Sequence, residues 1–376
     1  MLHLPSTALY TRVYIYIPIG LYLFERLVRT LRYAYNNIRP GRATLIQESG
    51  GVTKITVHSR QLKSWRPGSF VLLSLPRFGI GQSHPATIAS IPSSHEGKLV
   101  FLLRAHHGFT SRIHANASVD SLHEGTAEPP ASKTTHLALI DGPYGGKHLD
   151  FASFSTVLLV AGSAGVTFTV PILLDLAFRA QKQKLPVREV TFIWAIKTSQ
   201  CTTWIASELQ QAADELYKAG VDLTVRIFVT ADVEFVEESA DERVGDTQTS
   251  TCQCGNSSGE CSCISAATNQ RKNASASAQE SEEVQISETD LNNSKEVVEE
   301  KSAQPPAYTV PTPVSTLQAG RPDIHSIVSE AQKTSIGEMG VAVCGPVRLS
   351  TETRRVVSVL EGGGRGIYLH AESFGW

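Results

Sequence analysis

The fold is decided by the stretch VLLVAGSAGVT at residues 157–167. Its first five residues are all apolar, which is typical of a parallel strand buried on both faces. A glycine-bearing turn at 162–165 follows, and apolar residues then recur at helical spacing from 170 to 178. This strand-turn-helix order predicts one crossover unit of a parallel sheet, with the turn at a helix N-terminus that favours anions.

The same alternation continues toward the carboxyl end. We expect a strand at 190–196, a helix from near Thr202 or Thr203, and a strand at 223–229. After an interruption we expect a helix beyond Pro322, a strand at 341–343, a helix at about 350–360 and a last strand around 367–371. Residues 151–376 are therefore predicted to form a parallel-sheet nucleotide-binding domain.

Residues 40–150 carry a β pattern. Short apolar or alternating runs lie at 52–57, 70–73, 87–91, 99–103 and 137–140, with turn residues between them. We predict a six-stranded antiparallel barrel here.

The interruption at 234–313 is rich in Ser, Glu, Asn, Ala and Gln and ends in a proline-rich run. Between Asp232 and Lys301, sixteen residues are acidic and five are basic, whereas the whole chain carries a net charge of only −2. Such a segment buries too little apolar surface to offset its ordering entropy. We predict a disordered, acidic insertion that the compact domain does not need.

Four of the six cysteines lie within this insertion, at Cys252, Cys254, Cys261 and Cys263. Four thiolates could bind zinc or Cu(I) or assemble an iron–sulfur centre, but the C-x-C-x6-C-x-C spacing matches no common zinc pattern. We predict no metal site, and this cluster remains the alternative. The rest of the chain has no spaced cysteine framework, which favours a reducing, cytosolic setting.

Near the N-terminus, the apolar run Val13–Phe24 precedes five arginines, at 26, 29, 32, 39 and 42. The segment is either an amphipathic surface helix or the cytosolic end of a membrane helix. Arginines that follow the apolar run favour the second interpretation, because basic residues gather on the inner side of membranes. Residues 1–39 are thus expected to be the end of a transmembrane helix and a basic juxtamembrane segment.

Four short motifs carry chemistry. Taken singly, each has an ordinary interpretation: Gly162–Thr167 is a helix-starting turn, Asp141–Gly146 is a linker turn, and His84–Ser90 contains a turn histidine. Cys344-Gly345-Pro346 follows a strand, at the edge where α/β sheets bind ligands, but Cys344 could equally be a small buried hydrophobe. In this order, the four together are specific.

The four motifs resemble those of the C-terminal part of fungal ferric reductases, the family shared with NADPH oxidases. The resemblance extends to Gly320-Arg321-Pro322-Asp323 and to the terminal Glu372–Trp376, and it covers roughly residues 10–230 and 315–376. It implies a ferredoxin reductase-like fold that binds FAD and NADPH and passes electrons from NADPH through FAD toward haem and ferric iron. The alternatives are a superoxide-generating NADPH oxidase-type reductase and a catalytically inactive, membrane-associated remnant.

The resemblance also implies residue roles. Catalytic roles fall to Thr87 beside the flavin, Cys344 near the nicotinamide and Phe374 over the flavin ring. The flavin should further contact the barrel residues His84, Pro85, Ile88, Ser90, Arg104, His106, Gly108, Phe109 and Thr110. The turn residues Gly142, Pro143, Tyr144 and Gly145 are also expected to bind a cofactor. NADPH should be held by Gly162, Gly165, Val166, Thr167, Gly345 and Pro346, with Arg321 on its 2′-phosphate, where a guanidinium fork suits phosphate.

Two residues depart from the family pattern, Ala86 in place of the usual Phe and Ser163-Ala164 in a usually glycine-rich loop. Of the family's haem-binding membrane domain, only the last helix could be present in this chain, before Arg39. We therefore expect no haem on this chain. Its expected partners are NADPH, ferric chelates or a haem-bearing membrane domain, and the membrane itself, but no nucleic acid. The family implies the plasma membrane, with the bulk of the chain cytosolic.

Overall fold

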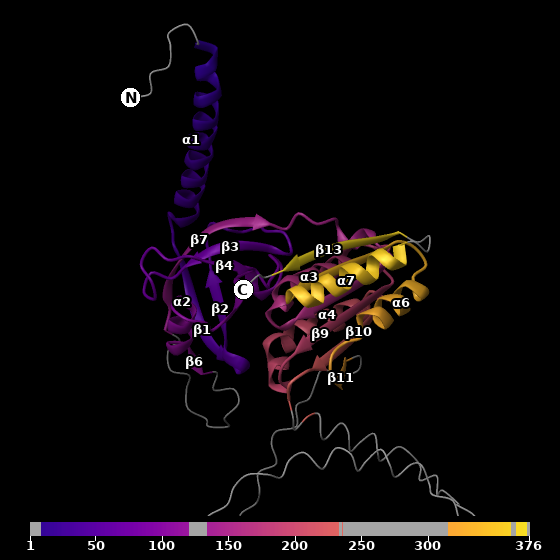
Figure 1. The fold of residues 1–376 in the computed structure, drawn as a ribbon. Helices are drawn as coiled ribbons and strands as arrows, with labels where there is room; N and C mark the ends of the chain where they lie inside the picture. The colour runs from indigo at the N-terminus through magenta and orange to yellow at the C-terminus, as the bar shows by residue number, and fades with distance from the viewer. Residues whose placement is uncertain (1–8, 120–133, 233–234, 236–314, 362–365, 374–376) are drawn as a thin grey trace, which may run out of the picture. The chain divides into compact units, whose positions relative to one another are not determined.

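A computed structural model describes residues 9–119, 134–232, 235, 315–361 and 366–373 (Figure 1). The N-terminal half contains helices α1 (Leu9–Asn37) and α2 (Phe109–Ala115) and strands β1 (Gly41–Glu48), β2 (Val52–His58), β3 (Ser69–Ser74), β4 (His84–Thr87), β5 (Leu99–Arg104), β6 (Ser118–Val119) and β7 (His136–Gly145). The C-terminal half contains β8 (Thr156–Gly162), α3 (Val166–Lys182), β9 (Glu189–Ile196), the 3-10 helix η6 (Ser199–Ile205), α4 (Ala206–Lys218), β10 (Asp222–Val229), β11 (Ser315–Ala319), α6 (Ile324–Thr334), β12 (Met339–Gly345), α7 (Val347–Leu360) and β13 (Ile367–Ser373).

The first half is an antiparallel barrel, as the sequence predicts. Its strand order is β4-β3-β7-β1-β2-β5, and short β6 pairs in parallel with β1. The backbone N–H of Ala89, just after β4, donates to the Val100 carbonyl on β5 (2.8 Å) and so joins the two outer strands. Alternate apolar side chains fill the interior, among them Leu45, Ile55 and Val71.

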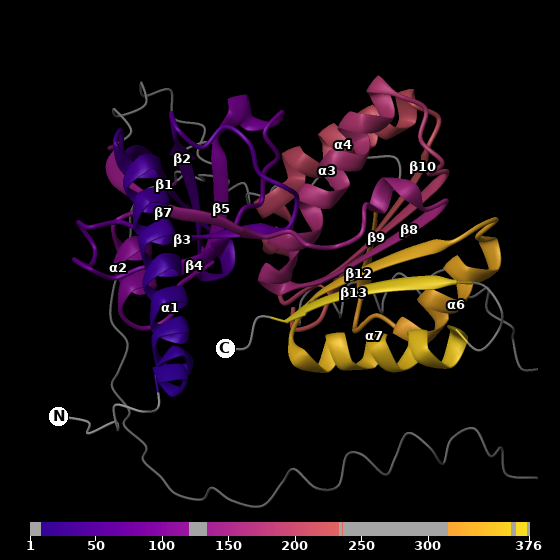
Figure 2. The same ribbon diagram turned by 90° about the horizontal axis from the view of Figure 1, so that it is seen from above.

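The second half is the predicted parallel sheet, in the order β11-β10-β9-β8-β12-β13. Two apolar cores cover its two faces, one built with α3 and α4 and the other with α6 and α7 (Figure 2). Strand β8 is buried along its whole length, which explains its unbroken apolar sequence.

Three details differ from the expectations. The strand expected at 87–91 is β4 at His84–Thr87, because Ser90 instead accepts from the Val100 N–H and donates to the Lys98 carbonyl, in place of ladder bonds. The helix expected from Thr202 or Thr203 begins at Ala206, after η6. Strand β11 and helix α2 are too short to show a clear sequence period.

Helix α1 includes the apolar run Val13–Phe24, and its C-terminal part is bonded to β7. Asn37 donates to the Ile140 carbonyl and accepts from the Ile140 N–H, both at 2.9 Å. Arg29 forms an ion pair with Asp141 (3.0 Å). The end of α1 is thereby attached to the barrel.

Among the described residues, one helical segment, Ser163–Lys182, is long and apolar enough to cross a membrane. It is the core helix beside β8, and 67% of its most apolar window is buried in the protein. The four-cysteine cluster and nearly all of the segment at 234–313 lie outside the described residues.

The barrel and the parallel sheet belong to one compact unit. Val52, Ile91 and Leu102 of the barrel half are buried in the same apolar cluster as α3 and Trp204. The two halves therefore share part of a core.

Candidate cofactor site

A cleft of about 420 Å³ lies between the barrel and the carboxyl ends of β8 and β12. Twelve residues predicted from sequence line it, and they come from both halves of the chain: His84, Pro85, Thr87, Arg104, His106, Phe109, Thr110, Gly162, Gly165, Thr167, Gly345 and Pro346. The fold thus brings the flavin motifs and the nucleotide motifs to one cavity, of a size typical of small-molecule sites.

The barrel wall of the cleft is built from β4, β5 and α2. The His84 ring stacks on Phe109, with centroids 6.5 Å apart. Burial lowers the pKa of His84, and nearby His106 lowers it further, so the His84 imidazole is neutral at neutral pH. The His106 N–H donates to the Thr110 hydroxyl (3.0 Å), which fixes the turn that follows β5. This wall offers an aromatic surface and the cationic side chain of Arg104 to a ligand.

The opposite wall consists of two loops that touch backbone to backbone. A Cβ added to Gly165 would collide with the carbonyl of Cys344, and one added to Gly162 would lie 2.7 Å from Pro346 Cδ. A Cβ on Gly345 would lie 3.0 Å from the Gly162 backbone. A side chain at Gly162 or Gly165 would therefore force the loops apart, and one at Gly345 would be tightly packed. The loop precedes α3, whose N-terminus favours a phosphate.

The backbone of Ser163 shows how the loop accommodates one of the two departures from the family pattern, the serine in a usually glycine-rich loop. Its φ of +51° lies in the left-handed region that favours glycine. Its carbonyl accepts from the Trp194 Nε1–H (3.1 Å), a contact that holds the loop in this conformation. The loop thus keeps a glycine-like backbone with a serine in place.

Several predicted residues lie behind the cleft lining. Ile88, Val166 and Cys344 have no exposed surface, and the hydroxyl of buried Ser90 bonds to the barrel backbone at Lys98 and Val100. Burial raises the pKa of the Cys344 thiol, and Glu372 raises it further, so Cys344 is a neutral thiol. Their roles toward the cofactors stay predictions.

The turn Gly142–Gly145 also lies apart from the cleft. Tyr144 lines a second cavity, of about 530 Å³, with α1 residues including Phe24 and Arg32. The Tyr144 hydroxyl donates to Asp141, and Arg32 lies 5.1 Å from the Tyr144 ring centroid. The turn is placed to hold α1, and a direct flavin contact remains a prediction.

The three remaining predicted residues are Gly108, Arg321 and Phe374. Gly108 is exposed and precedes α2 with a φ of +77°, and it does not line the cleft. Arg321 is exposed and follows β11, at the same carboxyl edge of the sheet as the cleft loops. Phe374 lies outside the described residues. Strand β13 pairs Glu372 with Cys344 and Ser373 with Gly345, so its last residue lies beside the cleft loop.

Six further residues line the cleft that were not predicted to contact a cofactor: Ala86, Leu102, Leu103, His107, Ser163 and Ala164. Leu102 and Leu103 resemble ordinary strand residues in the sequence, so no sequence signal separates them. Ala86 and Ser163-Ala164 stood inside motifs already singled out.

The glycine-only contacts and the cleft fit a bound dinucleotide, and comparisons with known proteins agree. Residues 39–148 match the FAD-binding domain model, and residues 154–358 match the ferric reductase NAD binding domain model. The chain therefore carries an FAD-binding and a nicotinamide nucleotide-binding domain of an oxidoreductase.

Curated relatives include a probable cell surface ferric reductase of Aspergillus oryzae, 31% identical over 54% of this chain and 27% of its own length. A ferric/cupric reductase transmembrane component of Schizosaccharomyces pombe is 27% identical over 63% of this chain and 46% of its own length. Human dual oxidase 2 is 28% identical over 58% of this chain and 13% of its own length. The chain thus spans less than half the length of these relatives.

Among solved structures, a ferredoxin NADP+ reductase from Neisseria gonorrhoeae with bound FAD and NADP is similar over 88% of this chain and 97% of its own, at 9% identity and a TM-score of 0.48. That likeness is too distant to say what this chain binds. The family match rests instead on the two domain models, of which the second alone covers more than half of the chain. The chain belongs to the ferric reductase family, whose relatives here include both metalloreductases and dual oxidases.

Proposed function

We propose that this chain is the electron-delivering part of a ferric-chelate reductase, which takes electrons from NADPH through FAD to an acceptor. The observation that carries the proposal is the single cleft that gathers residues of the flavin motifs and the nucleotide motifs. Ferric and cupric reductases among the relatives support ferric iron as the final acceptor.

The two cofactors, when bound, supply the hydride and single-electron chemistry themselves. The chain's own residues bind and orient them. Gly162, Gly165 and Gly345 let the two loops pack closely at the start of α3, where the helix N-terminus favours a pyrophosphate, and Arg104 offers a cation to the flavin's phosphates. Thr87, half-buried on β4, can donate a hydrogen bond into the cleft, and the apolar side chains of Leu102 and Leu103 help exclude water.

Flavin binding tests the proposal first. Purified protein incubated with FAD should keep the flavin absorbance bands through gel filtration, and NADPH should bleach them without oxygen. A chain that stays colourless under all conditions would instead match the inactive remnant.

Arg321 should set the preference for NADPH. Its loss removes a charge-assisted contact to the 2′-phosphate, so Arg321→Ala should lower the NADPH/NADH ratio of kcat/KM about 10- to 100-fold with ferricyanide as acceptor. Arg188→Ala, an exposed arginine just before β9 at the opposite sheet edge, is the control. Equal ratios in the Arg321→Ala and wild-type proteins would assign the 2′-phosphate to another residue.

The second candidate is a superoxide-producing oxidase, which the dual oxidase relatives favour. Comparing superoxide release with ferric-chelate reduction in the same NADPH-reduced preparation separates the two. Attachment to a membrane through α1 is part of both proposals, and its basis is the exposed apolar run with its arginines and the membrane relatives.

A further inference from the structure

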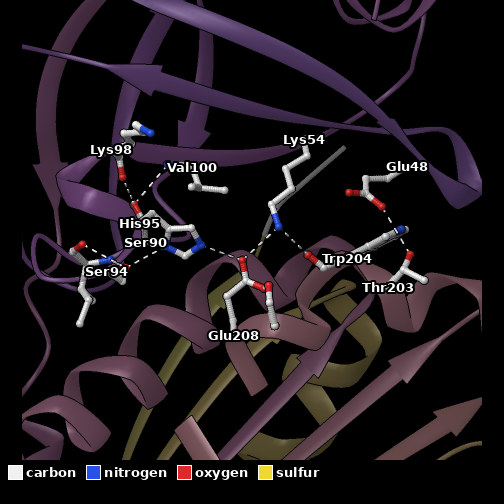
Figure 3. A network of polar contacts seen from close by, with 12 residues as sticks. Glu48, Lys54, Ser90, Ser94, His95, Lys98, Val100, Thr203, Trp204 and Glu208 are labelled. Atoms are coloured by element: carbon white, nitrogen blue, oxygen red, sulfur yellow. Dashed lines mark hydrogen bonds and ion pairs between the residues drawn. The ribbon is translucent and has the colours of Figure 1, made fainter. Parts of the chain in front are cut away.

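A buried ion cluster joins the barrel to helix α4, beside the cofactor cleft (Figure 3). Glu208 lies in the first turn of α4, and its side chain is only 4% exposed. One carboxylate oxygen, Oε1, accepts from Lys54 Nζ on β2 (3.1 Å) and from His95 Nε2 in the β4–β5 loop (2.9 Å). We call Glu208, Lys54 and His95 the Glu208 cluster.

The carboxylate of Glu208 is fully engaged and ionised. Its second oxygen accepts from the Ser207 hydroxyl (2.7 Å). Burial by itself would raise the pKa of Glu208, but the hydrogen bond from His95, the charge of Lys54 and the Ser207 hydroxyl outweigh it and lower the pKa to about 2. Glu208 therefore carries its negative charge at every physiological pH.

The loop that carries His95 is held in an unusual backbone conformation. His95 and Glu96 have φ of +51° and +56°, values that side-chain-bearing residues rarely adopt. Such conformations persist where surrounding contacts over-determine them. Here the contacts are those of the His95 ring, from Nδ1 to the Ser94 hydroxyl oxygen (2.9 Å) and from Nε2 to Glu208.

Further polar bonds flank the cluster along the same contact between the two halves. Lys54 Nζ also reaches the Trp204 carbonyl (3.4 Å). Trp204 Nε1 donates to the Ser49 carbonyl (3.0 Å), and the Ser49 hydroxyl donates to the Gln200 carbonyl (2.7 Å). On one side of Glu208, the turn between β1 and β2 is thus bonded to η6. On the other side, His95 in its loop bonds to Glu208 itself.

The barrel partners of Glu208 lie next to the elements that line the cleft. Lys54 is the direct cross-strand neighbour of Leu102, which lines the cleft. His95 lies between β4 and β5, which carry the barrel wall. A shift of Lys54 and His95 against α4 would therefore move this wall relative to the Gly162 loop.

We infer that Glu208 is a positioning residue for electron transfer between the two cofactors: its carboxylate clasps the barrel to α4 and sets the separation of the two cleft walls. The inference rests on the proposed function, because it assigns both cofactors to this cleft. Buried ion pairs add little stability over apolar packing, but a lysine and a histidine that bond to one carboxylate oxygen specify a single arrangement. Hydride transfer depends on such placement, and a displacement of about 1 Å can cost on the order of 100-fold.

The test compares wild type, Glu208→Gln, Lys54→Met and the double variant, each as the full chain loaded with FAD. Asp214→Asn on the exposed face of α4, where Asp214 bonds only Gln210 within the helix, is the matched control. Stopped-flow absorbance measures flavin reduction by NADPH and, separately, by dithionite, which needs no nucleotide placement. Hydrogen exchange of residues 49–51 and 199–205 in the cofactor-free proteins reports on the contact itself.

We expect each single variant to slow reduction by NADPH about 10- to 100-fold, with little change in the dithionite rate or in the NADPH concentration for half-maximal rate. The double variant should be faster than either single one, because it leaves no unpaired buried charge between Lys54 and Glu208. Exchange at both segments should rise in the single variants and stay unchanged in Asp214→Asn.

Wild-type rates with NADPH in Glu208→Gln and Lys54→Met would overturn the inference, even if both variants melted earlier, because the cluster would then only stabilise the fold. If wild type binds FAD but NADPH does not reduce it, the proposed function fails. The exchange data then still decide whether Glu208 holds the contact.

Discussion

Gly165 is the residue at which the cleft tolerates least change. A methyl group there would collide with the Cys344 carbonyl, and backbone cannot move aside as a flexible side chain can. Gly165→Ala should destabilise the protein by about 1–3 kcal/mol and weaken NADP+ binding. Urea unfolding and calorimetric titration measure the two effects.

Gly366→Ala serves as the control for Gly165→Ala, because the nearest atom to its added methyl group is 3.8 Å away. Equal effects of the two substitutions would contradict the close contact of the Gly162 and Cys344 loops.

Ser163 is the residue whose replacement should strengthen the fold. Its left-handed backbone costs an L-residue on the order of 1 kcal/mol, and glycine avoids this cost. Ser163→Gly should therefore raise the free energy of unfolding by up to about 1 kcal/mol, whereas Ser163→Ala, which keeps the Cβ, should not. Denaturant unfolding measures the stability of both variants. If Ser163→Ala were also more stable than wild type, the cost would come from the Ser163 hydroxyl and not from its backbone conformation.

Glu208 should make stability depend on acid pH. Its pKa falls from an ordinary 4.5 to about 2 on folding, so its contribution is fully present above pH 4.5. That contribution is lost as pH falls from about 4.5 toward 2. The difference in unfolding free energy between wild type and Glu208→Gln should therefore become smaller as the pH is lowered through this range.

Exposed Glu330→Gln, whose carboxylate is 3.7 Å from Arg226 at the surface, is the control for the acid series. A wild-type advantage over Glu208→Gln that persisted unchanged at pH 3 would mean that Lys54 and His95 do not depend on the charge of Glu208.

At the scale of elements, helix α1 and strand β7 should behave as one unit. Arg29 pairs with Asp141, whereas the Arg26 side chain contacts Glu25 and Tyr22 of α1 itself. Arg29→Ala should lower the free energy of unfolding, since it leaves the Asp141 carboxylate without its cation. It should also speed hydrogen exchange in β7, and Arg26→Ala should do neither.

A β7 whose exchange is the same in Arg29→Ala, Arg26→Ala and wild type would show that the bonds of Arg32, Asn36 and Asn37 to the β7 backbone hold α1 without the ion pair. The combination Arg29→Ala with Asn37→Ala then tests that alternative.

At the scale of the whole molecule, the sheet topology limits how much of the acidic insertion can be deleted. Strands β10 and β11 are neighbours and run parallel, so the chain must return along the sheet between Val229 and Ser315. A parallel connection of this kind needs about a dozen residues. Removing all of 234–313 would leave too few.

Deleting Arg243–Tyr308 instead leaves 230–242 and 309–314 for the crossover. That variant should keep its FAD content and its NADPH-driven reduction of ferricyanide. Deletion of 234–313 should lose part of both, because β11 could no longer pair with β10. Full activity in the longer deletion would mean that β11 is not needed for the fold.

The sequence by itself determined the two-part architecture and most of the cleft. Unbroken apolar strands and period-two runs report directly on burial, so β8 and the barrel strands could be read from local pattern. Glycine positions 162, 165 and 345 were also visible, because a missing Cβ marks close backbone approach.

Only the tertiary structure decided which motif residues share a cavity. It placed His84 and Gly162 in one cleft, put the Gly142–Gly145 turn against α1, and brought Lys54 and His95 to Glu208 across more than a hundred residues of sequence. A buried ion cluster has no local sequence signal, since each member is an ordinary charged or polar residue in its own element. Its chemistry depends on burial and on partners that only the folded chain supplies.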